Sequence, residues 1–238
     1  MNNQRCLAVV PARGGSKRIP RKNIRAFAGR PMIEYAIAAA RETGLFTRVV
    51  VSTDDAEIAD LARGAGAQVP FVRPPELADD ITPTVPVVAH AIAECAARGW
   101  EADLVCCIYP GVPLLRPADI VRAHAEAMSG EPGHYVFPLV EYPSPVQRAL
   151  RRGSDGRVAP LYPEFALTRT QDLEPAYHDA GQFYWGESAL WLDGKTIHEN
   201  GRGIVLPASR VVDIDTPEDW KRAEALYAVT DRRERPDR

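Results

Sequence analysis

The feature that most constrains the fold is an alternation of short apolar runs with longer helical patterns over the first two thirds of the chain. Residues 6–10, 48–53 and 102–109 have the length and the apolar side chains of buried strands. Between these runs, apolar residues recur at helical spacing instead. Such an alternation is typical of β-α-β units around a mostly parallel sheet, so we expect an α/β fold.

Helices are predicted at residues 31–44, 53–66, 82–99 and 116–130. The first places Ile33, Ile37 and Ala40 on one face and ends at a glycine stop signal. The second has acidic residues in its first turn, and we expect Thr53 to be its N-cap. In the fourth, Pro117 suits the first turn, because a backbone N–H is not needed there.

A hairpin is predicted further along the chain, where this pattern changes. Residues 135–142 read as a strand, and residues 146–152 and 157–162 read as two more strands joined by the tight turn GSDG. A hairpin inserted in an α/β domain has to bury its apolar face elsewhere, often against another subunit. We therefore expect residues 140–175 to form the dimerisation arm of a homodimer.

The remaining segments are expected to return to the main domain. Strands are predicted at residues 181–186, 203–207 and 210–214, and a helix at residues 216–229. The chain has 238 residues, 45% of them hydrophobic, which is enough for one sizeable core. We expect a single domain over residues 1–230, with residues 231–238 as a charged tail.

Composition argues against several classes of protein. Lysine and arginine total 29 against 32 acidic residues, which is unlike a protein that coats nucleic acid. The four cysteines lack CxxC pairs and histidines at zinc-site spacing, so we expect buried thiols in a reducing cytoplasm. The first apolar run is too short for a signal peptide, and no run approaches the ~20 residues of a membrane span. We expect a cytoplasmic protein without membrane contacts.

A strongly basic segment follows the first predicted strand. Residues 11–23, PARGGSKRIPRKN, open a stretch to Ile33 that contains seven basic residues and no acidic one. A solvated surface loop normally mixes both signs of charge, so it explains this stretch poorly. A nucleic-acid patch and an anion site at a helix start remain open as alternatives.

A polyphosphate ligand explains both the charge and the flexible backbone of this segment. Backbone N–H groups of Gly14, Gly15 and Ser16 can wrap phosphate oxygens. Lys17 and Lys22 can offset the charge of those oxygens. The GxxxxGK[ST] and GxGxxG patterns are absent, so neither a P-loop nor a dinucleotide site is supported. The position after a first strand is nevertheless where ligands usually bind in open α/β sheets.

Two aspartates near the end of the chain form a second chemical signal. If residues 210–214 are a strand, Asp213 and Asp215 point to the same face. Two carboxylates on one face make a hard-oxygen site that suits Mg²⁺. The alternative is that Asp215 helps to cap the next helix, where TPED resembles a capping box that starts at Thr216. That alternative explains Asp213 poorly, because adjacent like charges repel unless a cation joins them.

Taken together, these segments resemble a known family. PARGGSKRIPRKN is similar to the N-terminal signature of the CMP-sialic acid synthetases, cytidylyltransferases that activate nine-carbon acid sugars. The similarity continues through VVVSTDD, VRPPELADD and DIDTPEDW, and so spans nearly the whole chain. EYPSPVQRAL and RTQDLEPAYHDAGQFYWG look most like the branch that acts on pseudaminic acid. The resemblance implies a Rossmann-like nucleotidyltransferase fold of three layers.

The resemblance also implies a role for each matching residue. CTP would be held by Arg13, Gly14, Gly15, Ser16, Lys17, Lys22, Asn23, Arg73 and Thr84, the last two lying against cytosine. The acid sugar would be held by Tyr109, Arg169, Gln171, Tyr177, His178, Asp179, Gln182 and Phe183. Asp213 and Asp215 would bind Mg²⁺, and Arg13, Lys17 and Lys22 would complete the catalytic set.

The implied reaction is nucleotidyl transfer, in which the anomeric hydroxyl of the acid sugar attacks the α-phosphorus of CTP and pyrophosphate leaves. N-Acetylneuraminic and legionaminic acids are alternative acceptors. A sugar-1-phosphate nucleotidyltransferase would share this chemistry but would need a second basic site. A non-catalytic nucleotide binder would keep the basic loop without needing the aspartate pair.

Overall fold

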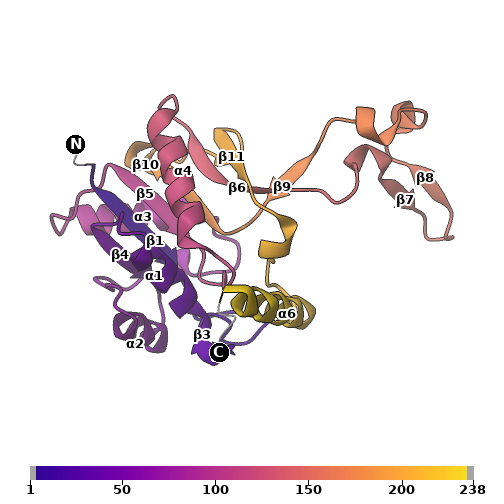
Figure 1. Ribbon diagram of the computed structural model, residues 1–238. Coiled ribbons are helices and arrows are strands. Elements are labelled where there is room, and N and C mark those ends of the chain that lie inside the picture. Colours follow the sequence, from indigo (N-terminus) through magenta and orange to yellow (C-terminus); the bar gives the residue numbers. More distant parts are fainter. Residues whose placement is uncertain (1–3, 235–238) are drawn as a thin grey trace.

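The computed structural model describes residues 4–234, and a seven-stranded sheet forms its centre (Figure 1). In chain order the strands of this sheet are β1 (Cys6–Pro11), β4 (Arg48–Ser52), β5 (Leu104–Ile108), β6 (Tyr135–Glu141), β9 (Tyr177–Asp179), β10 (Phe183–Glu187) and β11 (Gly201–Val205). Their spatial order is β11-β6-β10-β5-β1-β4, with β9 also paired to β6.

The directions of these strands confirm a mostly parallel sheet. β1 pairs in parallel with β4 and β5, and β6 pairs in parallel with β11. β10 runs antiparallel between β5 and β6, and β9 is antiparallel to β6. All strands except β9 and β10 therefore point the same way, and the loops after β1, β4 and β5 meet at one edge of the sheet.

Six helices lie within the described residues, and all except the short one at residues 188–192 are at positions that the sequence predicted. They are α1 (Met32–Glu42), α2 (Ala56–Gly64), α3 (Thr84–Ala96), α4 (Pro117–Ser129), α5 (Ser188–Leu192) and α6 (Pro217–Glu234). The expected α1 face is confirmed, because Ile33, Ile37 and Ala40 are all fully buried. The expected N-cap of α2 is wrong. Asp55 caps that helix by accepting from the Ile58 N–H at 3.0 Å, whereas Thr53 accepts from the Asp55 N–H.

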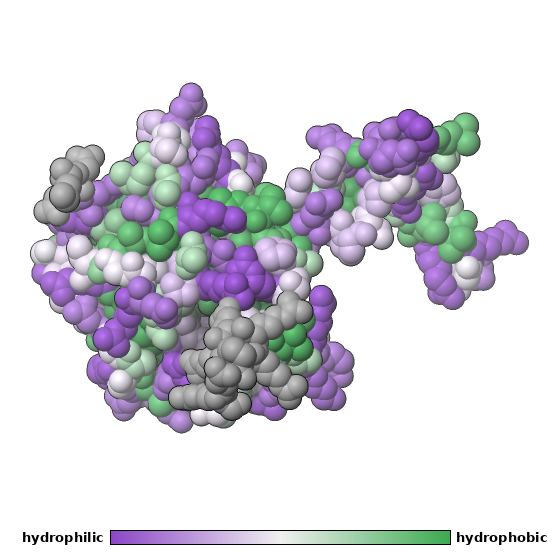
Figure 2. Space-filling model, viewed as in Figure 1, coloured by the Kyte–Doolittle hydropathy of each residue, from purple (hydrophilic) through white to green (hydrophobic). Residues whose placement is uncertain are grey.

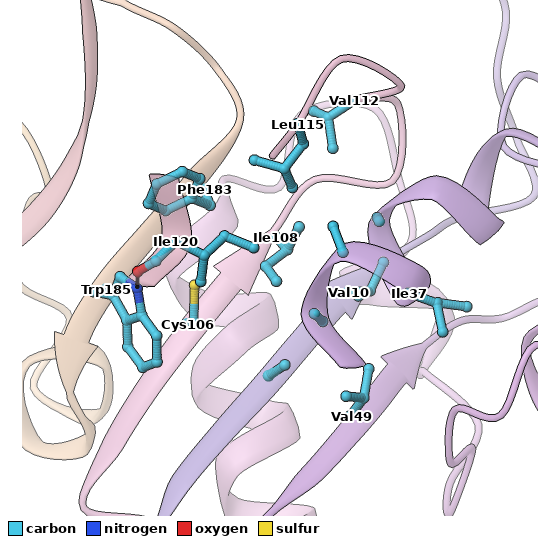
Figure 3. Close-up of a cluster of buried hydrophobic side chains, with 14 of the residues drawn as sticks. Val10, Ile37, Val49, Cys106, Ile108, Val112, Leu115, Ile120, Phe183 and Trp185 are labelled. Atoms are coloured by element: carbon cyan, nitrogen blue, oxygen red, sulfur yellow. Dashed lines mark hydrogen bonds between the residues drawn. The ribbon is translucent and has the colours of Figure 1, made fainter. Parts of the chain in front are cut away.

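The core consists of two apolar clusters on opposite faces of the sheet and a third beside it. The first cluster joins the sheet to α1, α2 and α4, and Figure 3 shows its Ile37, Ile120 and Phe183 side chains. The second joins the other face to α3 and α5. Alternating residues of β1 enter the two clusters, so the three-layer arrangement is confirmed. All four cysteines are buried and free, as expected.

The third cluster holds α6 against a short two-stranded sheet. Its strands are β2 (Ala26–Phe27) and β3 (Arg30–Pro31), and Phe27 stacks edge-on against Trp220 of α6. Ile214 is buried in the same cluster. The segment leading into α6 is thereby anchored beside the basic loop.

The prediction of a strand over residues 210–214 is wrong. Arg210 ends a short 3-10 helix, and residues 211–215 are extended but pair with no strand. Val211 packs in the first apolar cluster and Ile214 in the third, so both side chains are buried without strand pairing. The 3-10 helices in the described chain are η1 (Pro75–Leu77), η2 (Val146–Arg148), η3 (Pro163–Phe165), η4 (Thr170–Asp172) and η5 (Ala208–Arg210).

An extended arm leaves the sheet between β6 and β9 and projects from the body (Figure 1). It contains the predicted hairpin, whose strands are β7 (Leu150–Arg152) and β8 (Val158–Pro160). The arm begins after β6 ends at Glu141 and stops before β9 begins at Tyr177, so it spans residues 142–176. Residues 135–142, read as a strand beside this hairpin, instead supply β6 of the central sheet. Figure 2 shows hydrophobic residues on the surface of the arm. Leu167, one of its apolar residues, is 98% accessible.

The charged tail predicted at residues 231–238 is partly helical. Residues 231–234 continue α6, and residues 235–238 lie outside the described range. No helix within residues 4–234 is both long and apolar enough to cross a membrane.

Candidate active site

A cavity of about 650 Å³ lies between the loops after β1 and β5 and residues 73–87, which lead into and begin α3. This volume is in the usual range for small-molecule sites. Its lining includes Arg13, Ser16, Lys17, Arg18, Lys22, Asn23, Arg73, Asp79, Asp80, Thr84, Tyr109 and Asp215. The fold therefore brings the basic loop, the predicted nucleotide contacts Arg73 and Thr84, and one of the paired aspartates to one hollow.

The basic loop is held in place by carboxylates from the loop after β4. The Gly14 N–H donates to Asp54 at 3.0 Å, and Arg21 makes a two-nitrogen ion pair with Asp55. Gly14 lies so close to Asp55 that a Cβ would sit 2.6 Å from its carboxylate oxygen, which explains the glycine. The Ser16 N–H donates to the Gly14 carbonyl at 3.1 Å. Two of the three amides predicted to wrap phosphate therefore have protein partners.

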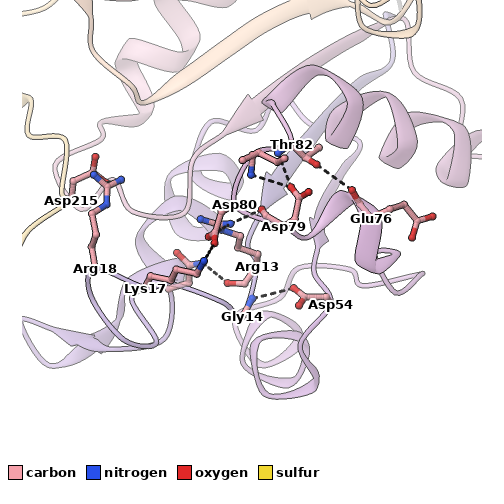
Figure 4. A network of polar contacts seen from close by, with 12 residues as sticks. Arg13, Gly14, Lys17, Arg18, Asp54, Glu76, Asp79, Asp80, Thr82 and Asp215 are labelled. Carbon is pink, nitrogen blue, oxygen red and sulfur yellow. Dashed lines mark hydrogen bonds and ion pairs between the residues drawn. The ribbon is translucent and has the colours of Figure 1, made fainter.

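Asp80 pairs with two of the cations that line the cavity, Arg13 and Lys17. Its carboxylate accepts from Arg13 at 2.7 Å and also pairs with Lys17 (Figure 4). The hydrogen bond from Lys17 lowers the pKa of Asp80 below its ordinary value. Arg13 additionally donates to the Asp79 carbonyl. The Asp80 carboxylate therefore offsets part of the positive charge that Arg13 and Lys17 bring to the cavity.

Lys22 and Arg18 connect the basic loop to the segment before α6. The Lys22 ammonium donates to the Ile214 carbonyl at 2.7 Å and lies 3.6 Å from the Asp215 carboxylate. Arg18 pairs with the same carboxylate at 2.9 Å. Asn23 reinforces the loop by donating to the Arg13 carbonyl at 3.0 Å.

Asp213 and Asp215 lie close enough to affect each other's charge although they are not on a strand. Asp213 is exposed, yet nearby protein atoms partly desolvate its carboxylate. This desolvation, together with the charge of Asp215, raises the pKa of Asp213 above its ordinary value. A bound cation would relieve both effects.

The oxygen ligands of this pair fit Mg²⁺, which usually takes one or two carboxylates and completes its shell with water and substrate phosphates. Within residues 4–234, no group of three or more His, Cys, Asp or Glu side chains is arranged to hold a metal alone. A metal here would therefore be shared between the aspartates and a nucleotide.

The residues predicted to hold the acid sugar are spread over several places. Tyr109 lines the cavity, and Gln182 is buried nearby and donates to the Arg210 carbonyl at 3.2 Å. Phe183 is fully buried in the first apolar cluster, so its side chain does not reach the cavity of this chain. Tyr177, His178 and Asp179 lie on β9 at the base of the arm.

Arg169 and Gln171 lie out on the arm itself. The Arg169 guanidinium pairs with Asp172 at 2.7 Å and is otherwise largely exposed. One protomer therefore does not bring Arg169 into its own cavity.

A model of the cytidylyltransferase family matches residues 7–184, which include the basic loop and most of the cavity lining. The chain belongs to the cytidylyltransferase family. In this cytidylyltransferase, the matched region begins in β1, includes the basic loop that follows it, and ends at the second residue of β10.

Named relatives cover nearly the whole chain. It is 42% identical over 224 residues to the pseudaminic acid cytidylyltransferase of Campylobacter jejuni, covering 94% of this chain and 96% of the relative. It is 33% identical to the CMP-N,N'-diacetyllegionaminic acid synthase of Legionella pneumophila, with 94% and 97% covered. These relatives confirm the predicted likeness to acid-sugar cytidylyltransferases.

Solved structures share the fold. CMP:2-keto-3-deoxy-manno-octonic acid synthetase complexed with CTP matches with a TM-score of 0.70 at 17% identity, over 95% of this chain and 99% of that one. A 4-diphosphocytidyl-2C-methyl-D-erythritol synthase matches with a TM-score of 0.65 at 14% identity, over 95% and 99%. Both support the nucleotidyltransferase fold that the sequence predicted.

Several cavity residues were missed by the sequence reading. Asp79 and Asp80 were visible as an acidic pair after a short helix-like segment, but acidic residues are not expected at an anion site. Asp54 and Asp55, which lie beside the cavity, were read as part of a helix start and of the segment VVVSTDD, and not as partners of the basic loop. Only the tertiary contacts show that these carboxylates hold and neutralise the basic loop.

Proposed function

We propose that this cytidylyltransferase couples CTP to pseudaminic acid and releases CMP-pseudaminate and pyrophosphate. The observation that carries the proposal is that one cavity combines a cationic loop after β1 with Asp215 and with Arg73 and Thr84. The 42% identity to a pseudaminic acid cytidylyltransferase supports the choice of acid sugar. The 33% identity to a legionaminic acid enzyme makes that acid the first alternative.

In the proposed complex, the triphosphate replaces the Asp80 carboxylate on Arg13 and Lys17. Gly14, Gly15, Ser16 and Asn23 shape the loop around it, and Lys22 contacts the phosphates from the side of Asp215. The cytosine lies against Arg73 and Thr84, at the other end of the cavity. Arg73 is 3% exposed and is held by Ser52, which supports a fixed, donor-only contact at that end.

The proposed chemical step is an in-line displacement at the α-phosphorus. The anomeric oxygen of the sugar forms a new bond to phosphorus, the bond to the pyrophosphate oxygen breaks, and the hydroxyl proton passes to water. Mg²⁺, held by Asp213 and Asp215, would polarise phosphate oxygens and acidify the attacking hydroxyl. Arg13, Lys17 and Lys22 offset the charge that accumulates on the leaving pyrophosphate.

The acid-sugar pocket is proposed to be completed by a second copy of the chain. Arg169, whose planar guanidinium suits bidentate carboxylate recognition, lies on the arm with Gln171, away from its own cavity. A homodimer that exchanges arms would bring these residues beside Tyr109 and Gln182, with Tyr177, His178 and Asp179 at the arm's base. The exposed apolar side chains of the arm support this arrangement.

We also propose that the enzyme works in the cytoplasm on small molecules, without nucleic acid or membrane partners. Its four free, buried cysteines suit a reducing compartment. The net charge of -3 and the five cationic side chains that line the cavity favour a small anionic ligand over a nucleic acid.

The decisive experiment measures pyrophosphate release from CTP and Mg²⁺ with pseudaminic, N-acetylneuraminic or legionaminic acid, and without any sugar. We expect release with pseudaminic acid and none without a sugar. Faster release with another acid would replace the proposed acceptor while keeping the reaction. Release with none of the acids would refute the proposed function.

A further inference from the structure

One carboxylate holds both ends of the basic loop. Asp55 is the N-cap of α2, and its side chain lies against Gly14 at the start of the loop and pairs with Arg21 near its end. Three residues between these ends line the cavity: Ser16, Lys17 and Arg18. Asp55 itself lines a separate hollow beside α2, so its effect on the cavity passes through the loop.

The contact at the start of the loop is close on two sides. Apart from its chain neighbours, the three atoms nearest to the position of a Gly14 Cβ all belong to the Asp55 side chain, at 2.6–3.2 Å. The adjacent Asp54 carboxylate accepts from the Gly14 N–H at 3.0 Å (Figure 4). Gly14 therefore has no room to move toward the start of α2.

The contact at the end of the loop joins an ion pair to an unusual backbone conformation. Both terminal nitrogens of Arg21 donate to the Asp55 carboxylate, one of them at 3.1 Å. The φ angle of Arg21 is 56°, in the left-handed region that residues other than glycine rarely adopt. Such a conformation persists where surrounding contacts hold it. Lys22 is the next residue and lines the cavity, so the conformation of Arg21 sets where Lys22 enters it.

Asp55 is held by the protein independently of the loop. Its carboxylate accepts from the Ile58 N–H at 3.0 Å, and its own N–H donates to the Thr53 hydroxyl at 3.1 Å. The Asp55 side chain is 19% exposed, whereas those of Lys17 and Arg18 are largely exposed. The exposed part of the loop therefore depends on its ends for its position.

We infer that Asp55 is a positioning residue for phosphate binding, because it fixes the two ends of the segment that carries Ser16, Lys17 and Arg18. The inference rests on the proposed function, in which this loop holds the triphosphate of CTP and then the pyrophosphate that leaves. Ordering a flexible segment around a ligand costs conformational entropy, and that cost is smaller when its ends are already fixed. Asp55 therefore strengthens the binding of an anion although it is itself an anion.

Charge and position predict opposite effects for this carboxylate. The hydrogen bond from Arg21 lowers the pKa of Asp55, so Asp55 is ionised at neutral pH. A negative charge beside a cationic loop repels phosphate, so its removal would tighten the binding of pyrophosphate if charge alone mattered. If Asp55 positions the loop, the removal weakens that binding instead. The sign of the change distinguishes the two effects.

The test measures the dissociation constant of pyrophosphate by titration calorimetry, with Mg²⁺ and without CTP or acid sugar. Asp55→Asn keeps the shape of the side chain and a good N-cap for α2, but it removes the ion pair with Arg21. We expect pyrophosphate to bind about three- to tenfold more weakly, which is the effect of leaving one or two side chains to be ordered on binding. CMP lacks the two outer phosphates and should bind as it does to the wild type.

Glu57→Gln is the matched control. Glu57 pairs with the same Arg21 at 2.5 Å, but its side chain is 66% exposed, and the atoms nearest to Gly14 belong to Asp55 instead. The substitution removes an equal charge near the loop. We expect pyrophosphate to bind this variant as tightly as the wild type, or slightly more tightly.

A second variant leaves the net charge unchanged. Arg21→Lys keeps a cation in the loop but replaces the two-nitrogen fork with a single ammonium group, so the end of the loop is held less well. Pyrophosphate should bind this variant about two- to threefold more weakly. Thermal melts show whether each variant is folded before its affinities are compared.

Each outcome decides for or against the inference. Weaker pyrophosphate binding in Asp55→Asn, with CMP binding unchanged and Glu57→Gln unaffected, supports it. Equal or tighter pyrophosphate binding in Asp55→Asn overturns it, as does an equal loss for CMP or in Glu57→Gln. If Asp55→Asn does not fold, Arg21→Lys decides, because unchanged binding in that variant also overturns the inference.

These outcomes are separate from the test of the proposed function. Pyrophosphate binding is measured without an acid sugar, so the inference can hold in a protein that releases no pyrophosphate from CTP. A wild-type protein that binds no pyrophosphate overturns the inference, whatever its turnover.

Discussion

At the scale of single residues, the cavity contains charges that are balanced only in part by the protein. The Asp80 carboxylate pairs with Arg13 and Lys17. By contrast, desolvation and the nearby charge of Asp215 raise the pKa of Asp213. In the proposed complex, the nucleotide phosphates would replace the Asp80 carboxylate on Arg13 and Lys17. The bound metal would stabilise the ionised form of Asp213. Substitutions at Asp213 and at Asp80 are therefore expected to have contrasting effects.

Replacing Asp213 by asparagine should lower turnover by two orders of magnitude or more, because a ligand of the proposed metal loses its charge. The measurement is pyrophosphate release at saturating CTP and acid sugar. Asp193→Asn, which removes an exposed carboxylate just after α5, serves as the control and should retain activity. Near-normal turnover in a folded Asp213→Asn enzyme would refute the metal role.

The same variant should be more heat-stable than the wild type in EDTA at neutral pH. Because the folded-state pKa of Asp213 is raised, its ionised form opposes folding above that pKa, and this penalty is absent below the ordinary carboxyl range. The difference in melting temperature should therefore shrink as the pH is lowered, and also when Mg²⁺ is added. Equal melting temperatures at every pH would contradict this account.

Replacing Asp80 by asparagine should tighten the binding of pyrophosphate by a few-fold, since partly exposed ion pairs contribute up to about 1 kcal/mol. Lys17→Ala should have the opposite effect, because it removes a cation rather than its competitor. Both dissociation constants can be measured by titration calorimetry. Weaker pyrophosphate binding in Asp80→Asn would show that Asp80 assists the anion instead of competing with it.

At the scale of elements, the short η5 helix is tied to α4 by a buried ion pair. Arg210 pairs with Asp119 through two guanidinium nitrogens, and both side chains are less than one-fifth exposed. Arg210 also accepts from Gln182 through its carbonyl. This connection fixes the start of the extended segment that carries Asp213 and Asp215.

Asp119→Ala should destabilise the protein by about 3 kcal/mol, because it leaves the Arg210 charge largely buried without its partner. Urea unfolding followed by circular dichroism measures this loss. Asp60→Ala is the matched control, since its pair with Arg63 is exposed and should contribute less than about 1 kcal/mol. Equal effects of the two substitutions would show that the buried pair is not a structural anchor.

At the scale of the whole molecule, contacts within one copy of the chain do not explain why the arm exposes apolar side chains. It carries Leu150, Val158 and Leu167 exposed to solvent, and it holds Arg169 away from the cavity. An arm that packs on a second copy would bury the apolar residues and bring Arg169 to the neighbouring cavity. In the proposed dimer, each active site would therefore contain residues of both copies of the chain.

Sites shared between protomers can be tested by mixing two inactive variants. Arg169→Ala and Asp213→Asn should each be inactive alone. After subunit exchange, half of the dimers carry one variant of each kind, and one of their two sites is intact, so about a quarter of wild-type activity should return. Mixing Arg169→Ala with Lys17→Ala should also restore activity. No recovery in a verified mixed dimer would place Arg169 in its own protomer's site.

The sequence by itself determined the layers of the fold and the position of the basic loop. Helix periodicity at Ile33, Ile37 and Ala40 and the apolar run at residues 102–109 depend on local spacing, so they predicted α1 and β5 correctly. The family signature depends on contiguous residues and was equally readable. Thr53 failed as a cap because Asp55, two residues later, also competes for the helix start.

Only the tertiary structure decided how charges and protons are arranged around the cavity. Asp80 and Lys17 are far apart in the chain, as are Lys22 and the Ile214 carbonyl that accepts from it. Residues 210–214 likewise alternate like a strand, but the two clusters that receive Val211 and Ile214 leave them unpaired. Local sequence carries periodicity, whereas such contacts depend on which loops the completed sheet brings to one edge.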